Sequence, residues 1–322
     1  MSHARGLALL LGLLAMSVEP AAGQVGAIDW LCRDGPDCRA TFTVRLATAP
    51  FPYDGIAVDT GEPFWDSYEE ETGQRLHTTQ DGVAYAENPH YLDDRVLVHL
   101  PPGFDAAQPF RVVVFFHGHL ADLVATVIDD YGVPEQVNRS GANLVLVAPA
   151  LAHDAIDSSI GRLGDPGGLA RLLGDVASVL EAQTGVPAAR VATAPVVLTA
   201  FSGGYRAVAF GLERGGLGER LDGILLLDAI YDHEDMLARH LRQHWRQGFF
   251  VALYTGRSER RTERLMTQLA LARVPYGGVT PAVLVDGTVA FPLIEADHFE
   301  IMRHGPPPWP LADLLARLAP PG

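Results

Sequence analysis

The sequence contains no lysine, and its acidic side chains outnumber its basic ones. Lysine plus arginine total 24, aspartate plus glutamate total 39, and the formal net charge is −15. Nucleic-acid-binding proteins usually carry a basic stripe, so this balance argues against a nucleic-acid partner. The glycine-rich stretch 164–168 is not followed by Gly-Lys-Ser/Thr, which excludes a phosphate-binding loop of that type.

Cysteine is almost as scarce, with Cys32 and Cys38 as the only two. Two cysteines without nearby histidines cannot complete a tetrahedral zinc site. In an exported chain such a close pair predicts a disulfide that closes a small loop, whereas in a reducing compartment both would be free thiols. His233 and Glu234 resemble the start of an H-E-x-x-H zinc motif, but Leu237 stands where the second histidine is needed. We therefore expect no metal site.

The N-terminus has the pattern of a secretory signal peptide. Arg5 precedes the apolar run 7–16, and small residues follow as far as Gly23. The run is shorter than the roughly 20 residues that span a bilayer, and no later segment is apolar for longer. Residues 1–23 thus predict export to the periplasm or the medium, with no membrane span after cleavage. An uncleaved membrane anchor is the alternative.

The remaining chain divides at about residue 94. Residues 24–93 predict an N-terminal extension with one strand at 40–47 and an irregular stretch that caps a cleft or covers a sheet edge. Residues 94–322 alternate apolar, β-branched runs with helical patterns. This alternation predicts an α/β catalytic domain whose central sheet is mostly parallel, with helices on both faces. Expected strands cover 95–100, 111–117, 143–149, 195–201, 223–228, 249–255 and 289–295.

In such a sheet the ligand site lies beyond the carboxyl ends of the strands. Ser202 follows the strand expected at 195–201 and begins Ser-Gly-Gly-Tyr, directly before a helical pattern. A nucleophilic serine on such a strained turn needs small neighbours two residues away, and Ala200 and Gly204 meet that need. Ala200 departs from the G-x-S-x-G pattern by one methyl group. The alternative interpretation is a serine that only caps a glycine-rich helix.

Two backbone N–H groups must stabilise the oxyanion that forms when a serine attacks a carbonyl. One is expected from Gly203, the residue after the nucleophile. The second is expected from His119, because the strand at 111–117 ends in His117-Gly118-His119. A simple tight turn beside a buried histidine is the alternative.

A base and an acid should follow the serine in the sequence. His298 comes just after the last expected strand, and imidazole exchanges protons near neutral pH. His304 is its nearest rival and is expected in a surface loop. Asp228 ends the strand expected at 223–228 and is the favoured acid, with Glu259, one strand later, as the alternative acid.

From about residue 94 to 304 the chain resembles the alpha/beta-hydrolase superfamily of serine esterases and lipases. The similarity is carried by RVVVFFHGH (111–119), TAFSGGY (199–205), LLLDAIYD (225–232) and ADHFEI (296–301). The resemblance implies the alpha/beta-hydrolase fold and a Ser–His–acid triad that acts through an acyl-enzyme with no cofactor.

Together these features predict an exported serine hydrolase that cleaves a carboxylic ester, on either a small molecule or a polymer. Two alternatives remain. An amidase or peptidase would use the same triad, and a binding protein would have kept the fold and lost the chemistry. The sequence does not indicate the acyl-chain length or the oligomeric state.

Overall fold

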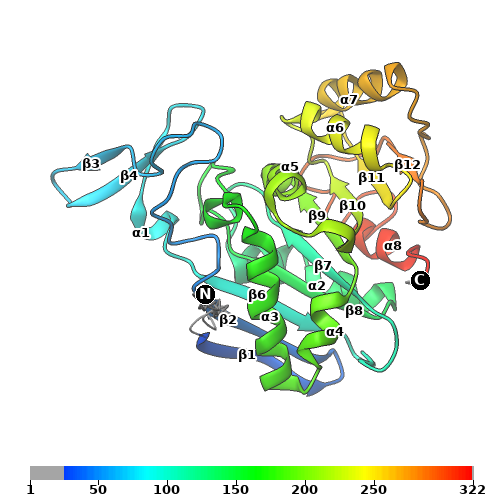
Figure 1. The fold of residues 1–322 in the computed structure, drawn as a ribbon, viewed down its shortest axis with the longest axis horizontal. Helices are drawn as coiled ribbons and strands as arrows, with labels where there is room; N and C mark the ends of the chain where they lie inside the picture. The colour runs from blue at the N-terminus through cyan, green and yellow to red at the C-terminus, as the bar shows by residue number, and fades with distance from the viewer. Residues whose placement is uncertain (1–24, 321–322) are drawn as a thin grey trace, which may run out of the picture.

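A computed structural model describes residues 25–320, and the predicted signal peptide at 1–23 lies outside the described residues. A nine-stranded sheet forms the centre of the molecule, and a separate three-stranded sheet projects from one side of it (Figure 1). The main sheet comprises, in spatial order, β1 (Val25–Gly35), β2 (Cys38–Leu46), β6 (Arg95–Leu100), β8 (Leu144–Pro149), β7 (Arg111–Phe116), β9 (Val196–Phe201), β10 (Leu221–Leu227), β11 (Phe249–Leu253) and β12 (Val289–Ala290). The small sheet comprises β3 (Ser67–Glu69), β4 (Gln74–Thr78) and β5 (Ala84–Ala86).

Seven strands of the main sheet run in one direction, and only β1 and β6 run in the other. Strands β7 to β11 are buried almost throughout because helices cover both faces of the sheet, as continuous apolar runs predict. The predicted fold class, a mostly parallel α/β sheet with helices on both faces, is confirmed.

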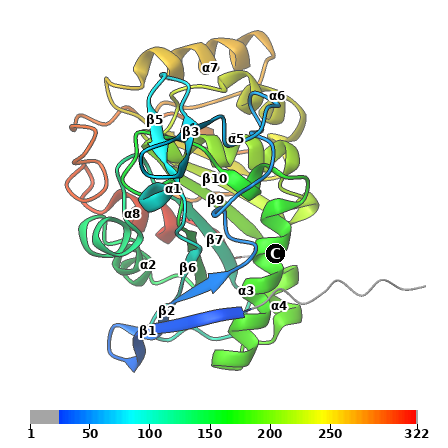
Figure 2. The same ribbon diagram turned by 90° about the vertical axis from the view of Figure 1, so that its left-hand side faces the viewer.

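Helices lie on both sides of the sheet, and each side has its own hydrophobic core. Helices α3 to α7 pack on one face, whereas η1, α2 and α8 pack on the other. Figure 2 shows α3 and α4 on the opposite side of the sheet from α2 and α8. The helices are α1 (Glu87–His90), η1 (Leu123–Asp130), α2 (Val133–Ser140), η2 (Gly161–Gly164), α3 (Gly168–Thr184), α4 (Ala188–Thr193), η3 (Ser202–Gly204), α5 (Tyr205–Arg214), η4 (Gly218–Arg220), α6 (Glu234–His244), α7 (Glu259–Leu271) and α8 (Pro310–Ala316).

Residues 25–93 contain more regular structure than the single strand expected from the sequence. The β1–β2 hairpin extends the main sheet at one edge, and the predicted Cys32–Cys38 disulfide joins its two strands. The small sheet folds over the carboxyl-end side of the main sheet. There the buried Arg206 of α5 forms an ion pair with Asp59, which precedes β3. Among the described residues, no helix is long and apolar enough to cross a membrane.

Candidate active site

Ser202 occupies a sharp turn between β9 and α5. Its φ is +50°, in the left-handed region that a residue with a side chain rarely adopts. Backbone strain of this kind persists only where the surrounding structure enforces it, and it is concentrated at functional sites. Ala200, two residues before the serine, is fully buried, whereas Ser202 itself is partly exposed. The turn therefore presents the Ser202 hydroxyl at the carboxyl end of the sheet.

Two glycines allow this turn to pack against the loop that follows β7. A Cβ atom on Gly204 would lie 2.3 Å from the carbonyl oxygen of Phe116. A Cβ atom on Gly118 would lie 2.8 Å from the Cβ of Ser202. Neither position has room for a side chain, so the loop can lie beside Ser202 only because both residues are glycine.

His298 and Asp228 complete a hydrogen-bonded chain that starts at Ser202. The Nε2 atom of His298 lies 2.8 Å from the Oγ of Ser202, and its Nδ1 atom lies 2.6 Å from the Oδ2 of Asp228. His298 is 5% exposed and Asp228 is fully buried. The imidazole thus connects the hydroxyl to a carboxylate that water does not reach.

Two residues of the segment between β11 and α7 hold the Asp228 carboxylate in place. The backbone N–H and the hydroxyl of Thr255 donate to it at 2.9 Å and 2.7 Å, and the Ser258 hydroxyl donates as well. Burial alone would raise the pKa of this carboxyl, but the hydrogen bonds from His298, Ser258 and Thr255 outweigh burial and hold the pKa below its ordinary value. Asp228 is therefore ionised at neutral pH.

The alternative residues from the sequence analysis lie elsewhere. Glu259 is an exposed residue at the start of α7, and it is not among the hydrogen-bond partners of His298. His304 is exposed and bonds through its backbone N–H to Glu300. The Tyr231 hydroxyl, which the sequence analysis did not single out, lies 3.1 Å from the Nδ1 of His298 and 3.3 Å from the Oδ2 of Asp228.

The structure brings the two predicted oxyanion residues into contact. A Cβ atom on Gly203 would lie 2.4 Å from the Cδ2 of His119, so the imidazole of His119 covers this glycine. Within residues 25–320, the backbone N–H of His119 donates to no protein group. That N–H is therefore free for a ligand, as an oxyanion donor requires.

Ser158 is a site residue that the sequence analysis missed. Its hydroxyl lies 2.7 Å from the Nε2 of His119, and it is 3.0 Å from where a Cβ on Gly203 would lie. Burial lowers the pKa of His119, so its ring is neutral at neutral pH. Ser158 belongs to a long loop without apolar periodicity. Only the position of that loop, after the strand β8, indicated that it lies at the carboxyl end of the sheet.

The described residues contain no group of three or more His, Cys, Asp and Glu side chains arranged to hold a metal ion. A cavity of about 620 Å³ lies away from Ser202, between the ends of α5 and α6 and the starts of β10 and β11. Leu217, His240 and Trp245 are among its lining residues.

The order of the strands and the place of the serine turn together identify the fold. Strands β2, β6, β8, β7 and β9 to β12 follow one another with β6 reversed, and the turn with Ser202 follows β9, near the middle of the sheet. The protein has the alpha/beta-hydrolase fold. The order in which Ser202, Asp228 and His298 occur along the chain is also the order typical of this fold.

Similarity to known proteins is found among solved structures, at low sequence identity. No family model and no curated protein matches the sequence. Among solved structures, an S-formylglutathione hydrolase from Agrobacterium tumefaciens is 10% identical, with 90% of this chain and 100% of that chain covered and a TM-score of 0.47. The feruloyl esterase module of Clostridium thermocellum is 13% identical, with 83% and 93% covered and a TM-score of 0.44. The fold is assigned from the strand order of this chain. The candidate catalytic residues are inferred from the hydrogen bonds between this chain's own side chains.

Proposed function

We propose that this protein is an exported serine hydrolase that cleaves a carboxylic ester through an acyl-enzyme. The observation that carries the proposal is the hydrogen-bonded chain from Ser202 through His298 to Asp228, with the serine held on a strained turn. A hydroxyl is a weak nucleophile at neutral pH, and a base within hydrogen-bond distance activates it. The similar solved structures include a feruloyl esterase module and an S-formylglutathione hydrolase.

In the first half of the reaction, Ser202 attacks the ester carbonyl while His298 accepts its proton at Nε2. The carbonyl oxygen becomes an oxyanion, which the backbone N–H groups of Gly203 and His119 stabilise. The intermediate then collapses: the bond to the alcohol oxygen breaks, and that oxygen takes the proton from His298. An acyl group remains on Ser202, and a water activated by the same imidazole releases the acid.

Asp228 orients the imidazole and stabilises the imidazolium that forms during both halves. Because its carboxylate is ionised and accepts the hydrogen of Nδ1, the other nitrogen of His298 is left to accept the serine proton. The first proton transfer therefore needs no tautomer change.

The proposed site of action is outside the cytoplasm. The N-terminal pattern of Arg5 and the apolar run 7–16 supports export, and the Cys32–Cys38 disulfide is of the kind that persists in oxidising compartments. The substrate is then an ester of a small molecule or of a polymer present in the periplasm or the medium.

Hydrolysis of matched chromogenic substrates tests the proposal. We expect the purified protein to hydrolyse p-nitrophenyl butyrate, and the corresponding anilide to react far more slowly. The Ser202→Ala variant should have no activity on either. Preferential cleavage of the anilide would favour an amidase or peptidase. A folded wild-type protein that hydrolyses neither substrate would favour a binding protein with this fold.

A further inference from the structure

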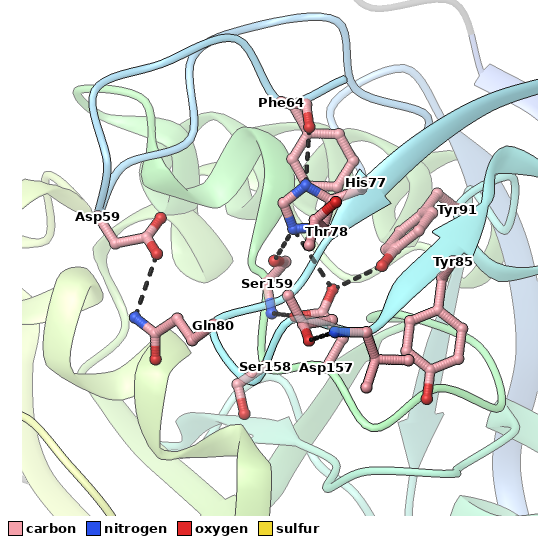
Figure 3. Close-up of polar contacts among 12 residues, drawn as sticks. Asp59, Phe64, His77, Thr78, Gln80, Tyr85, Tyr91, Asp157, Ser158 and Ser159 are labelled. Carbon is pink, nitrogen blue, oxygen red and sulfur yellow. Dashed lines mark hydrogen bonds and ion pairs between the residues drawn. The ribbon is translucent and has the colours of Figure 1, made fainter. Parts of the chain in front are cut away.

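The small sheet contacts the loop that contains Ser158 through a buried histidine of β4 and a tyrosine of β5 (Figure 3). His77 of β4 is 8% exposed, and its ring stacks on Phe64 with the ring centroids 4.0 Å apart. Its Nδ1 donates to the carbonyl oxygen of Phe64 at 2.7 Å, and its Nε2 is hydrogen-bonded to the hydroxyl of Ser159 at 3.1 Å. Strand β4 thereby holds the residue immediately after Ser158.

A buried carboxylate holds the same loop from the other side. Asp157 is 6% exposed; one of its oxygens accepts from the hydroxyl of Tyr91 at 2.8 Å, and the other accepts from the backbone N–H of Ser159 at 2.9 Å. The hydroxyl of Tyr85 accepts from the N–H of Ile156 at 3.0 Å. Residues 156, 157 and 159 are thus each bonded, on both sides of Ser158.

This anchoring determines where the Ser158 hydroxyl lies. Ser158 is 9% exposed, and its hydroxyl is hydrogen-bonded to the Nε2 of His119, whose ring covers Gly203. A displacement of the loop would release the ring of His119. The backbone N–H of the same residue is one of the two proposed oxyanion donors.

The pair of Ser159 and His77 is not arranged as a second nucleophile and base. Ser159 lies on no strand-to-helix turn, and its φ is not in the left-handed region. The hydrogen on the Nδ1 of His77 is given to a backbone carbonyl rather than to a carboxylate. Its nearest acid, Asp66, is 3.8 Å from that nitrogen. The pair therefore serves as a structural link.

We propose that His77 and Asp157 are positioning residues for the oxyanion site, which act through Ser158 and His119. This inference rests on the proposed ester hydrolysis. The small sheet then contributes to the rate of the chemical step without touching the substrate. Interactions realised only in the transition state change kcat and leave KM alone, so perturbing this chain of contacts should lower kcat selectively.

The test replaces His77 with phenylalanine, which keeps the ring stacked on Phe64 and removes both hydrogen bonds. Removal of an oxyanion donor typically lowers kcat by about 10²- to 10³-fold. A donor that is only partly misplaced should lower it less, so we expect His77→Phe to lower kcat about tenfold and to leave KM for p-nitrophenyl butyrate unchanged. Arg75→Gln is the matched control. Arg75 lies on the same strand and pairs with Glu87 and Asp54, but it does not contact the loop. We expect its kcat to stay within about twofold of wild type.

A double-mutant cycle shows whether the effect passes through Ser158. If it does, His77→Phe combined with Ser158→Ala should lower kcat no further than Ser158→Ala alone, to within about twofold. Three results would overturn the inference: an unchanged kcat for His77→Phe, an equal loss for Arg75→Gln, or losses that multiply in the double variant. A wild-type protein without esterase activity would overturn the proposed function and this inference with it.

Discussion

Replacing Gly204 with alanine should damage both the activity and the stability of this protein. The added Cβ would lie 2.3 Å from the carbonyl oxygen of Phe116, 2.8 Å from its carbonyl carbon and 2.9 Å from the carbonyl oxygen of His117. All three are backbone atoms of β7 and the loop after it, so no side chain can rotate away. The turn that carries Ser202 must move instead.

The size of the effect follows from these distances. Non-bonded carbon atoms prefer a separation of about 3.5 Å, so β7 and the turn must move apart by roughly 1 Å. A misplacement of about 1 Å at a catalytic group can cost about 10²-fold in rate. Forcing an extra methyl group into a packed site typically costs about 1 to 3 kcal/mol of stability. We therefore expect Gly204→Ala to lose about 10²-fold in kcat together with about 2 kcal/mol of unfolding free energy.

Steady-state kinetics on p-nitrophenyl butyrate and urea unfolding measure the two effects. Gly174→Ala is the control, because a Cβ on this glycine within α3 would have no atom within 4 Å. That control should keep wild-type kinetics and gain about 0.5 to 1 kcal/mol of stability from its better helix propensity. Wild-type activity and stability in Gly204→Ala would refute the requirement for glycine at the turn.

Two further predictions concern the acid partner and the dependence of stability on pH. Asp228→Asn should lower kcat by about 10³- to 10⁴-fold, whereas Glu259→Gln should change it less than about twofold; comparable losses in the two variants would contradict the choice of acid. His99 is buried with both ring nitrogens bonded, and burial lowers its pKa from 6.5 to about 4. The unfolded chain therefore takes up this proton first, and the stability that neutral His99 contributes is complete above pH 6.5 and lost as the pH falls toward 4. Urea unfolding at pH 7, 6 and 5 should show that the unfolding free energy of wild type falls with pH more steeply than that of His99→Gln, by about 1 kcal/mol per pH unit. Equal slopes in the two proteins would contradict the role of His99 in the loss of stability at acidic pH.

Much of the main sheet could be predicted because its strands are buried on both faces. The run 112–116 is apolar at every position, and the structure places the strand β7 at 111–116. The same strands located Ser202 and His298, since each follows a strand that ends at the same edge of the sheet. Short strands without such runs, as in β3 to β5, carry no comparable signal, and the sequence analysis did not predict them.

The acid and the surroundings of the oxyanion loop depend on contacts that sequence order does not indicate. Asp228 and Glu259 each follow a central strand, and what separates them is the direction of their side chains. Thr255 and Ser258, at the place where Glu259 was considered, donate to Asp228 instead. Ser158 is 39 residues from His119 in the sequence, and His77 is 82 residues from Ser159. Neither pair has a spacing or motif that would have shown the contact.

Covalent labelling tests the identity of the nucleophile most directly. The wild-type protein would be treated with a fluorophosphonate and digested, and the modified peptide would be identified by mass spectrometry. The proposed mechanism predicts one adduct, on Ser202, with no labelling of Ser202→Ala and strongly slowed labelling of His298→Gln. Equal labelling of wild type and Ser202→Ala, or an adduct on another serine such as Ser158 or Ser159, would contradict the assignment.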